Sequence, residues 1–456
     1  MIERSETDPR GYKGVLAESY DITPDKSAYI FHLRKGVKFS DGTPFNAKAA
    51  KYNWDKVLAV SDTRQYCDDI ESFEVIDDYT IRANIIPGKW NNLILEDFRN
   101  EIMMVLSPTS YEQNGEDWSN TNPIGTGPWL LSDYQRAQKH VFERNPDYWN
   151  QPYPYLDSFE FILMKDRTVA SMAYQAGEVE MFWSGNAPTA AELIKAGYEM
   201  YPTPVGGVFS LACNQKDPES AWSDIRMRQA LEYAIPKQKI ADGVGEGILT
   251  ASYECMRGTR GLGADYPIRE YDPEKAKQLM AEAGYPDGLT AELVVYTKFN
   301  GDQIVAVQGA LAEVGIDINI NVVTGPQWTE MQLTPAEGNG LYWERGKGAP
   351  SPRVQLNYAK EEYHSSSSNL PGAIRPPGFD ELIEQASLEE NPEKLREMLI
   401  EMGTMLYENS FNIPVIHWPT MQFVSPDVKW DKNLRPSFYT HAGNNQPHFE
   451  LIWLDR

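Results

Sequence analysis

A stretch near the N-terminus constrains the fold most, because it reverses the chain direction twice before a helix begins. Apolar and polar side chains alternate over Tyr29–Arg34, which predicts a β-strand. Gly36 interrupts this strand, and a second short strand is predicted over Val37–Phe39. The turn Ser40–Thr43 follows and contains a glycine, the residue that tight turns with a positive φ angle favour. We therefore expect a strand–turn–strand–turn unit that leads into a helix whose N-cap is Asn46.

The length and charge of the chain limit its class. Its 456 residues correspond to roughly three domains of about 150 residues, or to one large two-lobed fold. The 12 Trp and 25 Tyr residues fit either large cores or a ligand surface built from flat aromatic rings. The net charge of −24 argues against nucleic acid and anionic membranes as partners, because both require a basic face.

The three cysteines, Cys67, Cys213 and Cys255, are widely spaced and form no CxxC pattern. This argues against a disulfide framework and against a zinc ribbon, although one bridge with one free thiol stays open. No run of about 18 apolar residues predicts a membrane span. The polar start of the chain is no signal peptide, so either the leader is absent from this chain or the protein is cytoplasmic.

The first half of the chain predicts a mixture of strands and helices. Helical spacing of apolar residues predicts a helix over Asn46–Val60, and Phe73–Ile85 reads as a hairpin with two aspartates in its turn. A Gly/Pro break at 122–128 precedes a strand that ends near Tyr134. Alternation over Phe159–Lys165 predicts another strand, and a short helix is expected over Arg167–Gly177.

The second half predicts repeated α and β units. Helices are expected over Asp224–Ala234, which stops before Pro236, and over Asn391–Glu408, which starts with Asn391 and Pro392. A third helix, over Asp272–Gly284, is expected to be capped at both ends, by Asp272 and by Gly284. Between residues 291 and 322 the pattern is strand, helix, strand with short loops. That pattern is typical of a βαβ unit, so a parallel or mixed sheet is expected here.

The stretch Gly338–Gly378 is rich in Gly, Pro and Ser and is expected to be irregular. It reads either as a ligand-facing loop or as a surface insertion. Two separate strands are predicted after it, over Ile413–Trp418 and over Phe423–Val424.

No sequence motif predicts catalysis or a cofactor. GxSxG, GxGxxG, GxxxxGK[ST] and HExxH are all absent. His441 and His448 lie seven residues apart, which is a weak metal-site pattern, and we expect no metal site there. With 66 Asp and Glu residues present, a carboxylate-dependent hydrolase stays open as an alternative.

Six phrases occur in the order in which a known family has them. The chain resembles the family 5 (oligopeptide, dipeptide and nickel type) extracytoplasmic solute-binding proteins of ABC importers. The phrases are FHLRKGVKFSDGT, NPIGTGPW, GEVEM, DIRMRQALEYAI, YDPEKAKQLMAEAGYPDG and IPVIHW. Any one of them is weak, but six ordered matches over about 400 residues make the resemblance specific.

The resemblance implies an α/β, two-lobed fold of the class II periplasmic-binding-protein type, with a satellite domain inserted in the first lobe. It assigns residues 15–125 to the satellite, 126–203 and 432–456 to the first lobe, and 204–431 to the second lobe. Family members carry more residues before the FHLRKG phrase than this chain does. We therefore expect that the opening strand of the first lobe is missing.

The resemblance also implies where a ligand binds. One contact region follows the GE strand and maps to Trp183, Ser184 and Asn186, and a second one lies in the second lobe. The residues expected there are Tyr342, Trp343, Glu344, Arg345, Arg353, His417 and Trp418. Peptide receptors of the family place an Asp where this chain has Gly346, so Glu344 would have to pair with a peptide ammonium instead. The two arginines favour an anionic or hydroxyl-rich ligand.

The implied function is a receptor that traps a solute between its lobes and delivers it unaltered to the membrane permease of an ABC importer. An oligopeptide ranks first as the solute, an oligosaccharide second, and other small solutes such as opines and metal chelates follow. We expect no catalysis, no cofactor and no bound metal. The protein is expected to be a monomer in the periplasm or outside the cell, and a lipid anchor stays open.

Overall fold

The computed structural model of the protein describes residues 1–4, 12–60, 67–99, 101–299, 301–332, 338–347, 351–367, 369–430 and 448–456. Contacts divide the chain into two compact units. Unit 1 comprises Met1–Ala170 and Ser425–Arg456, and unit 2 comprises Ser171–Val424. Residues 171–203, which the sequence places in the first lobe, have most of their contacts within unit 2. The division into satellite and lobes stays a prediction, and His441 lies outside the described residues.

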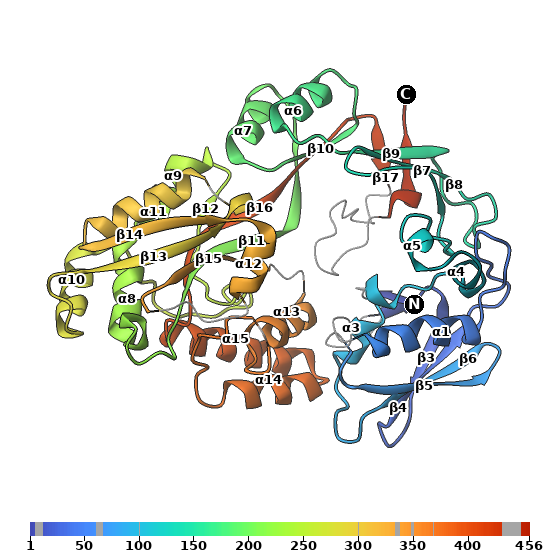
Figure 1. Ribbon diagram of the computed structural model, residues 1–456, viewed down its shortest axis with the longest axis horizontal. Coiled ribbons are helices and arrows are strands. Elements are labelled where there is room, and N and C mark those ends of the chain that lie inside the picture. The colour runs from blue at the N-terminus through green and yellow to red at the C-terminus, as the bar shows by residue number, and fades with distance from the viewer. Residues whose placement is uncertain are drawn as a thin grey trace. The chain divides into compact units, whose positions relative to one another are not determined.

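Unit 1 is built around a four-stranded antiparallel sheet with a helix packed on it (Figure 1). The elements are β3 (Ala17–Ile22), β4 (Ala28–Leu33), β5 (Ile70–Asp77), β6 (Thr80–Ile85) and α1 (Ala47–Ala59), and the strand order is β3-β4-β6-β5. Asn46 caps α1, because its Oδ1 accepts a hydrogen bond from the Ala49 N–H at 3.0 Å. The indole of Trp54 is fully buried and donates to the Met103 carbonyl oxygen at 3.1 Å. The predicted strand at Tyr29, the hairpin and the helix are confirmed.

The rest of unit 1 consists of small antiparallel sheets and short helices. β1 pairs with β2, β7 with β8 and β9, and β17 with β18. The strands are β1 (Ile2–Arg4), β2 (Tyr12–Gly14), β7 (Trp129–Gln135), β8 (Lys139–Arg144), β9 (Ser158–Ile162), β17 (Val428–Trp430) and β18 (Ile452–Leu454). The helices are α3 (Ile94–Asp97), η1 (Glu101–Met103), α4 (Pro108–Asn114), α5 (Glu116–Ser119) and η5 (Phe449–Leu451), and α6 (Arg167–Gln175) crosses the boundary to unit 2.

Unit 2 is built around a mixed sheet with the order β10-β16-β11-β15-β13-β14, and β12 pairs with β16. The strands are β10 (Met181–Ser184), β11 (Met200–Cys213), β12 (Thr250–Ala251), β13 (Leu289–Tyr296), β14 (Ile316–Val323), β15 (Leu341–Lys347) and β16 (Ile413–Val424). β13 is parallel to both β14 and β15, and the other pairs are antiparallel. The predicted βαβ unit is therefore confirmed, with α11 packed on β14.

Helices surround this sheet (Figure 1). They are α7 (Ala187–Lys195), η2 (Ala221–Ser223), α8 (Ile225–Ala234), α9 (Lys237–Gly245), α10 (Pro273–Glu282), η3 (Thr297–Phe299), α11 (Asp302–Ala312), α12 (Gly325–Gln332), α13 (Pro352–Tyr358), the π-helix η4 (Ala359–Tyr363), α14 (Phe379–Leu388) and α15 (Pro392–Glu408). Asp224, Asp272 and Asn391 accept backbone hydrogen bonds at the starts of α8, α10 and α15. The three predicted helices are confirmed, and so is the predicted cap at Asp272.

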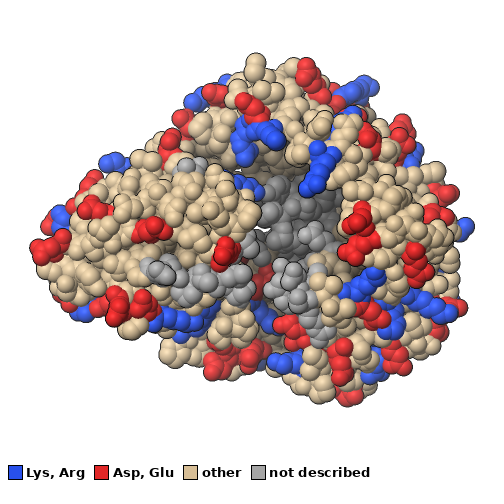
Figure 2. All heavy atoms as spheres, in the orientation of Figure 1, with Lys and Arg blue, Asp and Glu red and all other residues tan. Residues whose placement is uncertain are grey.

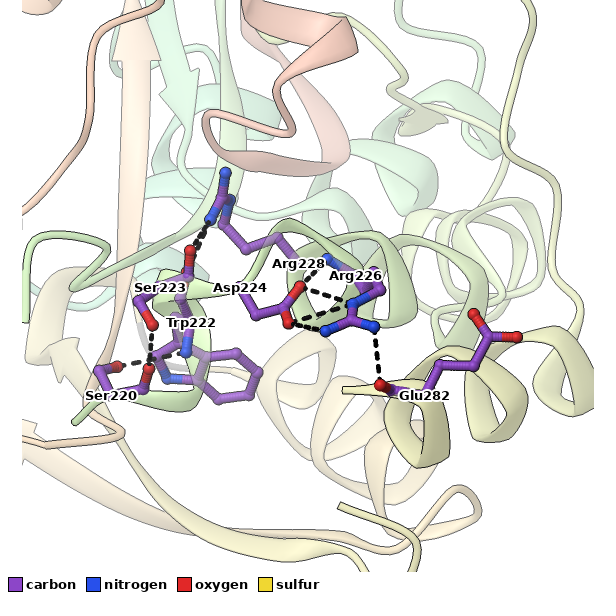
Figure 3. A network of polar contacts seen from close by, with 7 residues as sticks. All are labelled: Ser220, Trp222, Ser223, Asp224, Arg226, Arg228 and Glu282. Atoms are coloured by element: carbon purple, nitrogen blue, oxygen red, sulfur yellow. Dashed lines mark hydrogen bonds and ion pairs between the residues drawn. The ribbon is translucent and has the colours of Figure 1, made fainter. Parts of the chain in front are cut away.

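The phrase DIRMRQALEYAI forms α8, and its charged residues hold the helix in place (Figure 3). The Arg226 guanidinium pairs with Asp224 and donates to the Glu282 carbonyl oxygen of α10 at 2.7 Å. Arg228 donates to the carbonyl oxygens of Trp222 and of Ser410, at 2.8 and 3.1 Å. These residues of the phrase therefore join α8 to its neighbours.

Three sequence expectations about secondary structure are wrong. The stretch Gly338–Gly378 is not irregular, since its described part contains β15, α13 and η4. Its composition does not indicate β15, a central strand that pairs with β11 on one side and with β13 on the other. Val37–Phe39 forms only an isolated bridge between Lys38 and Pro44. The two strands expected after residue 413 are one continuous strand, β16, because it pairs along its length with β11 and β10.

Acidic and basic side chains are interspersed over the face drawn in Figure 2. Among the described residues on this face, no broad basic patch stands out, in keeping with the net charge of −24. Cys67, Cys213 and Cys255 are buried free thiols, so the open question of a bridge is answered in favour of none. In the described part of the chain, no helix combines the length and the apolar character needed to cross a membrane.

Candidate functional site

Three of the sequence-predicted site residues lie opposite one short segment of β11 in unit 2. His417 of β16 pairs with Val208, and Trp418 pairs with Gly207. On the other side of β11, Arg345 of β15 pairs with Phe209. The side chain of Arg345 lies directly over Gly207, where any Cβ would collide with it. The glycine thus makes room for a guanidinium beside the centre of the sheet.

A cavity of about 320 Å³ opens beside this segment. Its walls are residues 250–254, Arg257, Arg260, Val208 and His417. The short strand β12 brings the 250–254 wall to the sheet, because Thr250 pairs with His417. A cavity of this size with a few polar groups on its walls is typical of a small-molecule site.

The guanidinium of Arg257 is held at the cavity without an acidic partner. It donates from Nη1 to the Gly206 carbonyl oxygen, and within the described part of the chain no carboxylate oxygen lies within 4.0 Å of it. Burial lowers the pKa of Arg257 to about 10, with Glu254 opposing and Arg345 adding to the effect. At neutral pH the group remains a cation that is partly removed from water.

Glu254 provides the carboxylate on the cavity wall, and both of its oxygens accept hydrogen bonds from backbone amides. Its Oε2 accepts from the Gly258 N–H at 2.6 Å and its Oε1 accepts from the Arg260 N–H at 2.9 Å. Gln355 of α13 fixes the same loop by donating to the Arg257 carbonyl oxygen at 2.9 Å. These hydrogen bonds hold the loop in one conformation, in which the Arg257 side chain donates to Gly206.

His417 is neutral at physiological pH. Burial lowers its pKa to about 4, and the charges of Arg257 and Arg345 contribute to this shift. Its Nδ1 lies 3.5 Å from the Thr250 hydroxyl, whereas its Nε2 is buried with no hydrogen-bond partner among the described residues. This Nε2 atom points over Gly206, to which Arg257 also donates. The imidazole Nε2 of His417 and the guanidinium of Arg257 therefore both lie next to Gly206.

Trp343 and Trp418 contact Phe209 but differ in exposure. The ring of Trp343 stacks on Phe209 with centroids 5.6 Å apart and an interplanar angle of 5°, and Trp418 meets Phe209 edge-on at 5.6 Å. Trp343 is fully buried, whereas Trp418 keeps part of its surface exposed. In this structure the buried ring of Trp343 stabilises the sheet by packing on Phe209.

Glu344 lies on the opposite face of β15 from Trp343, and among the residues that the structure describes it has no cationic partner. Burial raises the pKa of its carboxyl to about 7, and a hydrogen bond from Asn412 Nδ2 at 3.3 Å opposes the shift. Gly346 follows two residues later on the same face, opposite Val208. Strand alternation therefore places Glu344 one step further along the sheet than the position at which the family has its Asp.

Trp183, Ser184 and Asn186 lie at the edge strand β10 and the start of α7. Ser184 donates to the Asn186 carbonyl oxygen at 2.7 Å, and Asn186 Oδ1 caps α7 by accepting from Thr189 N–H at 2.9 Å. Trp183 pairs in the sheet with Gln422, which is fully buried. The indole nitrogen of Trp183 and both amide atoms of Gln422 have no hydrogen-bond partner among the described residues.

Tyr342 and Arg353 lie away from the cavity walls. The Tyr342 hydroxyl donates to the Met331 carbonyl oxygen at 3.0 Å, next to Trp328 of α12. Arg353, in the first turn of α13, has a buried Nη1 without a hydrogen-bond partner in the described ranges. Of the predicted residues, the structure thus places His417 on the cavity wall and Arg345, Trp343 and Trp418 beside the same segment of β11.

The sequence profile of the family described as "Bacterial extracellular solute-binding proteins, family 5 Middle" matches residues 11–351 of this chain. The chain belongs to this family. This family 5 protein is similar to the glutathione-binding protein GsiB of Salmonella choleraesuis, with 28% identity over 334 residues that cover 72% of this chain. The chain spans 64% of the length of that relative. It also matches the heme-binding protein A of Haemophilus influenzae, with 26% identity over 91% of this chain and 80% of the relative.

Solved structures share the fold of this family 5 protein. The periplasmic binding protein DppA of Helicobacter pylori, described as ABC transporter-associated and in complex with the peptide STSA, matches with a TM-score of 0.81. The match covers 100% of this chain and 91% of that chain at 20% identity. The fold is therefore α/β and of the two-lobed periplasmic-binding-protein type, as the resemblance implied.

Sequence reasoning missed Arg257, Arg260 and the 250–254 wall of the cavity. Two signals in the sequence point to them. The dipeptide Gly206-Gly207 interrupts a strand, which indicates a close approach to the backbone. The segment Arg257–Gly261 reads RGTRG, with two arginines in a glycine-rich loop. Among the described residues, no group of three or more His, Cys, Asp or Glu side chains is arranged to hold a metal ion.

Proposed function

We propose that this protein is an extracytoplasmic receptor that binds a small solute and delivers it unaltered to the permease of an ABC importer. The observation behind the proposal is the cavity of about 320 Å³ with polar walls in a chain of family 5. The relatives named above are described as binding proteins, and DppA is described as associated with an ABC transporter. A place in the periplasm or outside the cell belongs to the same proposal.

An oligopeptide or a peptide-like compound is the proposed solute. GsiB is described as binding glutathione, which is a peptide, and DppA was solved with a peptide. The cavity supports this choice, since its arginines suit a carboxylate and its backbone groups suit amides. An oligosaccharide is the second candidate, favoured by the partly exposed Trp418 next to the polar cavity wall at His417.

The contact residues are part of the proposal. His417 is supported best, because it lines the cavity. Arg345 and Trp418 pair with neighbouring residues of β11 and stay proposed contacts. Glu344 is proposed for a solute ammonium group. Trp183, Ser184, Asn186, Tyr342, Trp343 and Arg353 stay proposed contacts, and the geometry of unit 2 gives most of them a structural task as well.

The test is to identify the solute and to ask whether it is changed. The protein is purified under native conditions, and native mass spectrometry detects the mass of any bound small molecule. The identified compound, peptide libraries and cello-oligosaccharides are then titrated by calorimetry and incubated with the protein for product analysis. We expect saturable binding with full recovery of the unaltered solute. Formation of product, or the failure of all candidate solutes to bind, would contradict the proposal.

A further inference from the structure

The charged side chains on the cavity walls do not neutralise one another completely. Two guanidinium groups, those of Arg257 and Arg260, stand against one carboxylate, that of Glu254. Both oxygens of Glu254 already accept backbone N–H groups, so it is committed to the loop. Arg260 donates to the Tyr266 carbonyl oxygen at 3.1 Å and lies over the Tyr266 ring, 5.2 Å from its centroid. Within the described ranges, the side chain of Arg257 donates to the Gly206 carbonyl oxygen alone.

A partly buried cation is unfavourable when it lacks an anionic partner, because its hydration is lost without a compensating charge. The planar guanidinium fork of Arg257 matches the two oxygens of a carboxylate, and one Nη1 bond to Gly206 leaves further N–H groups to donate. This local excess of positive charge stands out in a chain with a net charge of −24.

His417 lines the same cavity. When the Thr250 hydroxyl donates to Nδ1, the imidazole proton lies on Nε2, which is buried over Gly206 and has no partner in the described part of the chain. Gly206 is not one of the cavity walls, so Arg257 is the residue of this pair whose donors are available to the cavity.

We propose that this cavity binds a carboxylate group of the solute, with the Arg257 guanidinium as its main partner. The inference rests on the proposed function and narrows it to a class of acidic solutes. A carboxylate can come from the C-terminus of a peptide or from a uronic acid of a sugar. Both sources share the chemistry that the cavity recognises, and the experiment separates them.

The experiment titrates the full chain by calorimetry with two matched pairs of compounds. The first pair is trialanine and its C-terminal amide, and the second pair is α-1,4-digalacturonate and α-1,4-galactobiose. We expect that the acid of one pair binds about 10- to 100-fold more tightly than its neutral counterpart, as the loss of hydrogen bonds to a charged group implies. The pair that shows the preference identifies the source of the carboxylate.

Variants connect this preference to Arg257. R257Q is expected to remove the preference for the acid, so that the acid and its neutral counterpart bind alike. R257K keeps the charge but loses the planar fork and should keep part of the preference. R396Q, which removes the same charge from an exposed position on α15, should bind as the wild type does. Unfolding midpoints without solute show whether each variant is folded.

Three results would overturn the inference. Neutral compounds that bind as tightly as the acids show that no carboxylate site exists, while the proposed receptor function stands. A folded R257Q variant that keeps the full preference shows that another group binds the acid. If no compound of either pair binds and no solute co-purifies, the inference and the proposed function both fall.

Discussion

Glu344 and His417 are partly buried titratable residues whose pKa values move in opposite directions. Burial raises the pKa of Glu344 to about 7 and lowers that of His417 to about 4. The reason is the same for both, because burial disfavours the charged form of an acid and of a base alike. The two residues therefore contribute to the pH dependence of stability with opposite signs.

For Glu344, the native state binds a proton more tightly than the unfolded state. The unfolded carboxyl titrates near 4.5, so the native protein binds more protons between pH 4.5 and 7 and loses stability as the pH rises through this window. E344Q cannot ionise. We expect its stability relative to the wild type to increase by up to roughly 3 kcal/mol from pH 4.5 to pH 8, as measured by urea unfolding.

The control for this prediction is E292Q, since Glu292 is an exposed carboxylate on β13 of the same sheet. It should leave the pH profile of unfolding as it is in the wild type. Equal profiles for E344Q and the wild type would show that the Glu344 carboxyl titrates normally in the native state.

For His417 the sign is reversed. The unfolded imidazole titrates near 6.5 and the native one near 4, so the unfolded state binds more protons in between. The wild type should therefore lose stability as the pH falls from 6.5 to 4. H417Q should flatten this part of the profile by roughly 3 kcal/mol, as measured by urea unfolding at pH 4.5 and 7. An unchanged acid limb in H417Q would argue that the imidazole is protonated in the native protein.

At the scale of elements, the βαβ unit depends on how its two parallel strands start. β13 and β14 pair from their first residues, Leu289 and Ile316, and the Leu289 N–H donates to the Gly315 carbonyl oxygen at 3.0 Å. Gly288 has φ = +83°, and a Cβ there would stand against the Gly315 carbonyl oxygen. The strands approach closely at this point because the side chain is absent.

Gly284 offers a matched comparison, since it has φ = +99° at the end of α10 and open space around it. G284A should lower the free energy of unfolding by about 1–2 kcal/mol, because a left-handed conformation is unfavourable for alanine. G288A should cost about 1–3 kcal/mol more, because the same conformational strain is joined by a backbone collision. Urea unfolding of both variants tests this difference. Equal losses would mean that the strand starts shift apart without penalty.

At the scale of the whole molecule, the candidate site lies within one unbroken segment of the chain. Unit 2 runs from Ser171 to Val424 without interruption, and its first and last strands, β10 and β16, pair with each other. The segment thus begins in α6, and its first and last strands are neighbours in the sheet. Every wall of the cavity and every proposed contact residue belongs to this segment.

We expect the fragment 171–424 to fold without unit 1. It should show a far-UV circular dichroism spectrum of an α/β domain and a cooperative urea transition, since it has its own sheet and its own buried core. A fragment that unfolds without a cooperative transition would show that unit 2 depends on unit 1. The full chain, measured in the same buffer, provides the reference spectrum and transition.

The sequence by itself determined the features that depend on near neighbours. Asn46 and Asp272 were predicted as caps because a cap bonds to backbone groups two or three residues away. The hairpin at Phe73–Ile85 and the βαβ unit follow from local periodicity in the same way. The ordered phrases identified the family, which the profile match confirmed.

The tertiary structure alone decided what the cavity is made of. β15 was not predicted, since its stability comes from pairing with β11, more than a hundred residues earlier in the chain. Arg257 and His417 meet at Gly206 only because β12 pairs with β16 and the following loop folds over the sheet. Their interactions depend on their distance in space. Because these residues lie far apart in the chain, no local sequence pattern predicts their contact.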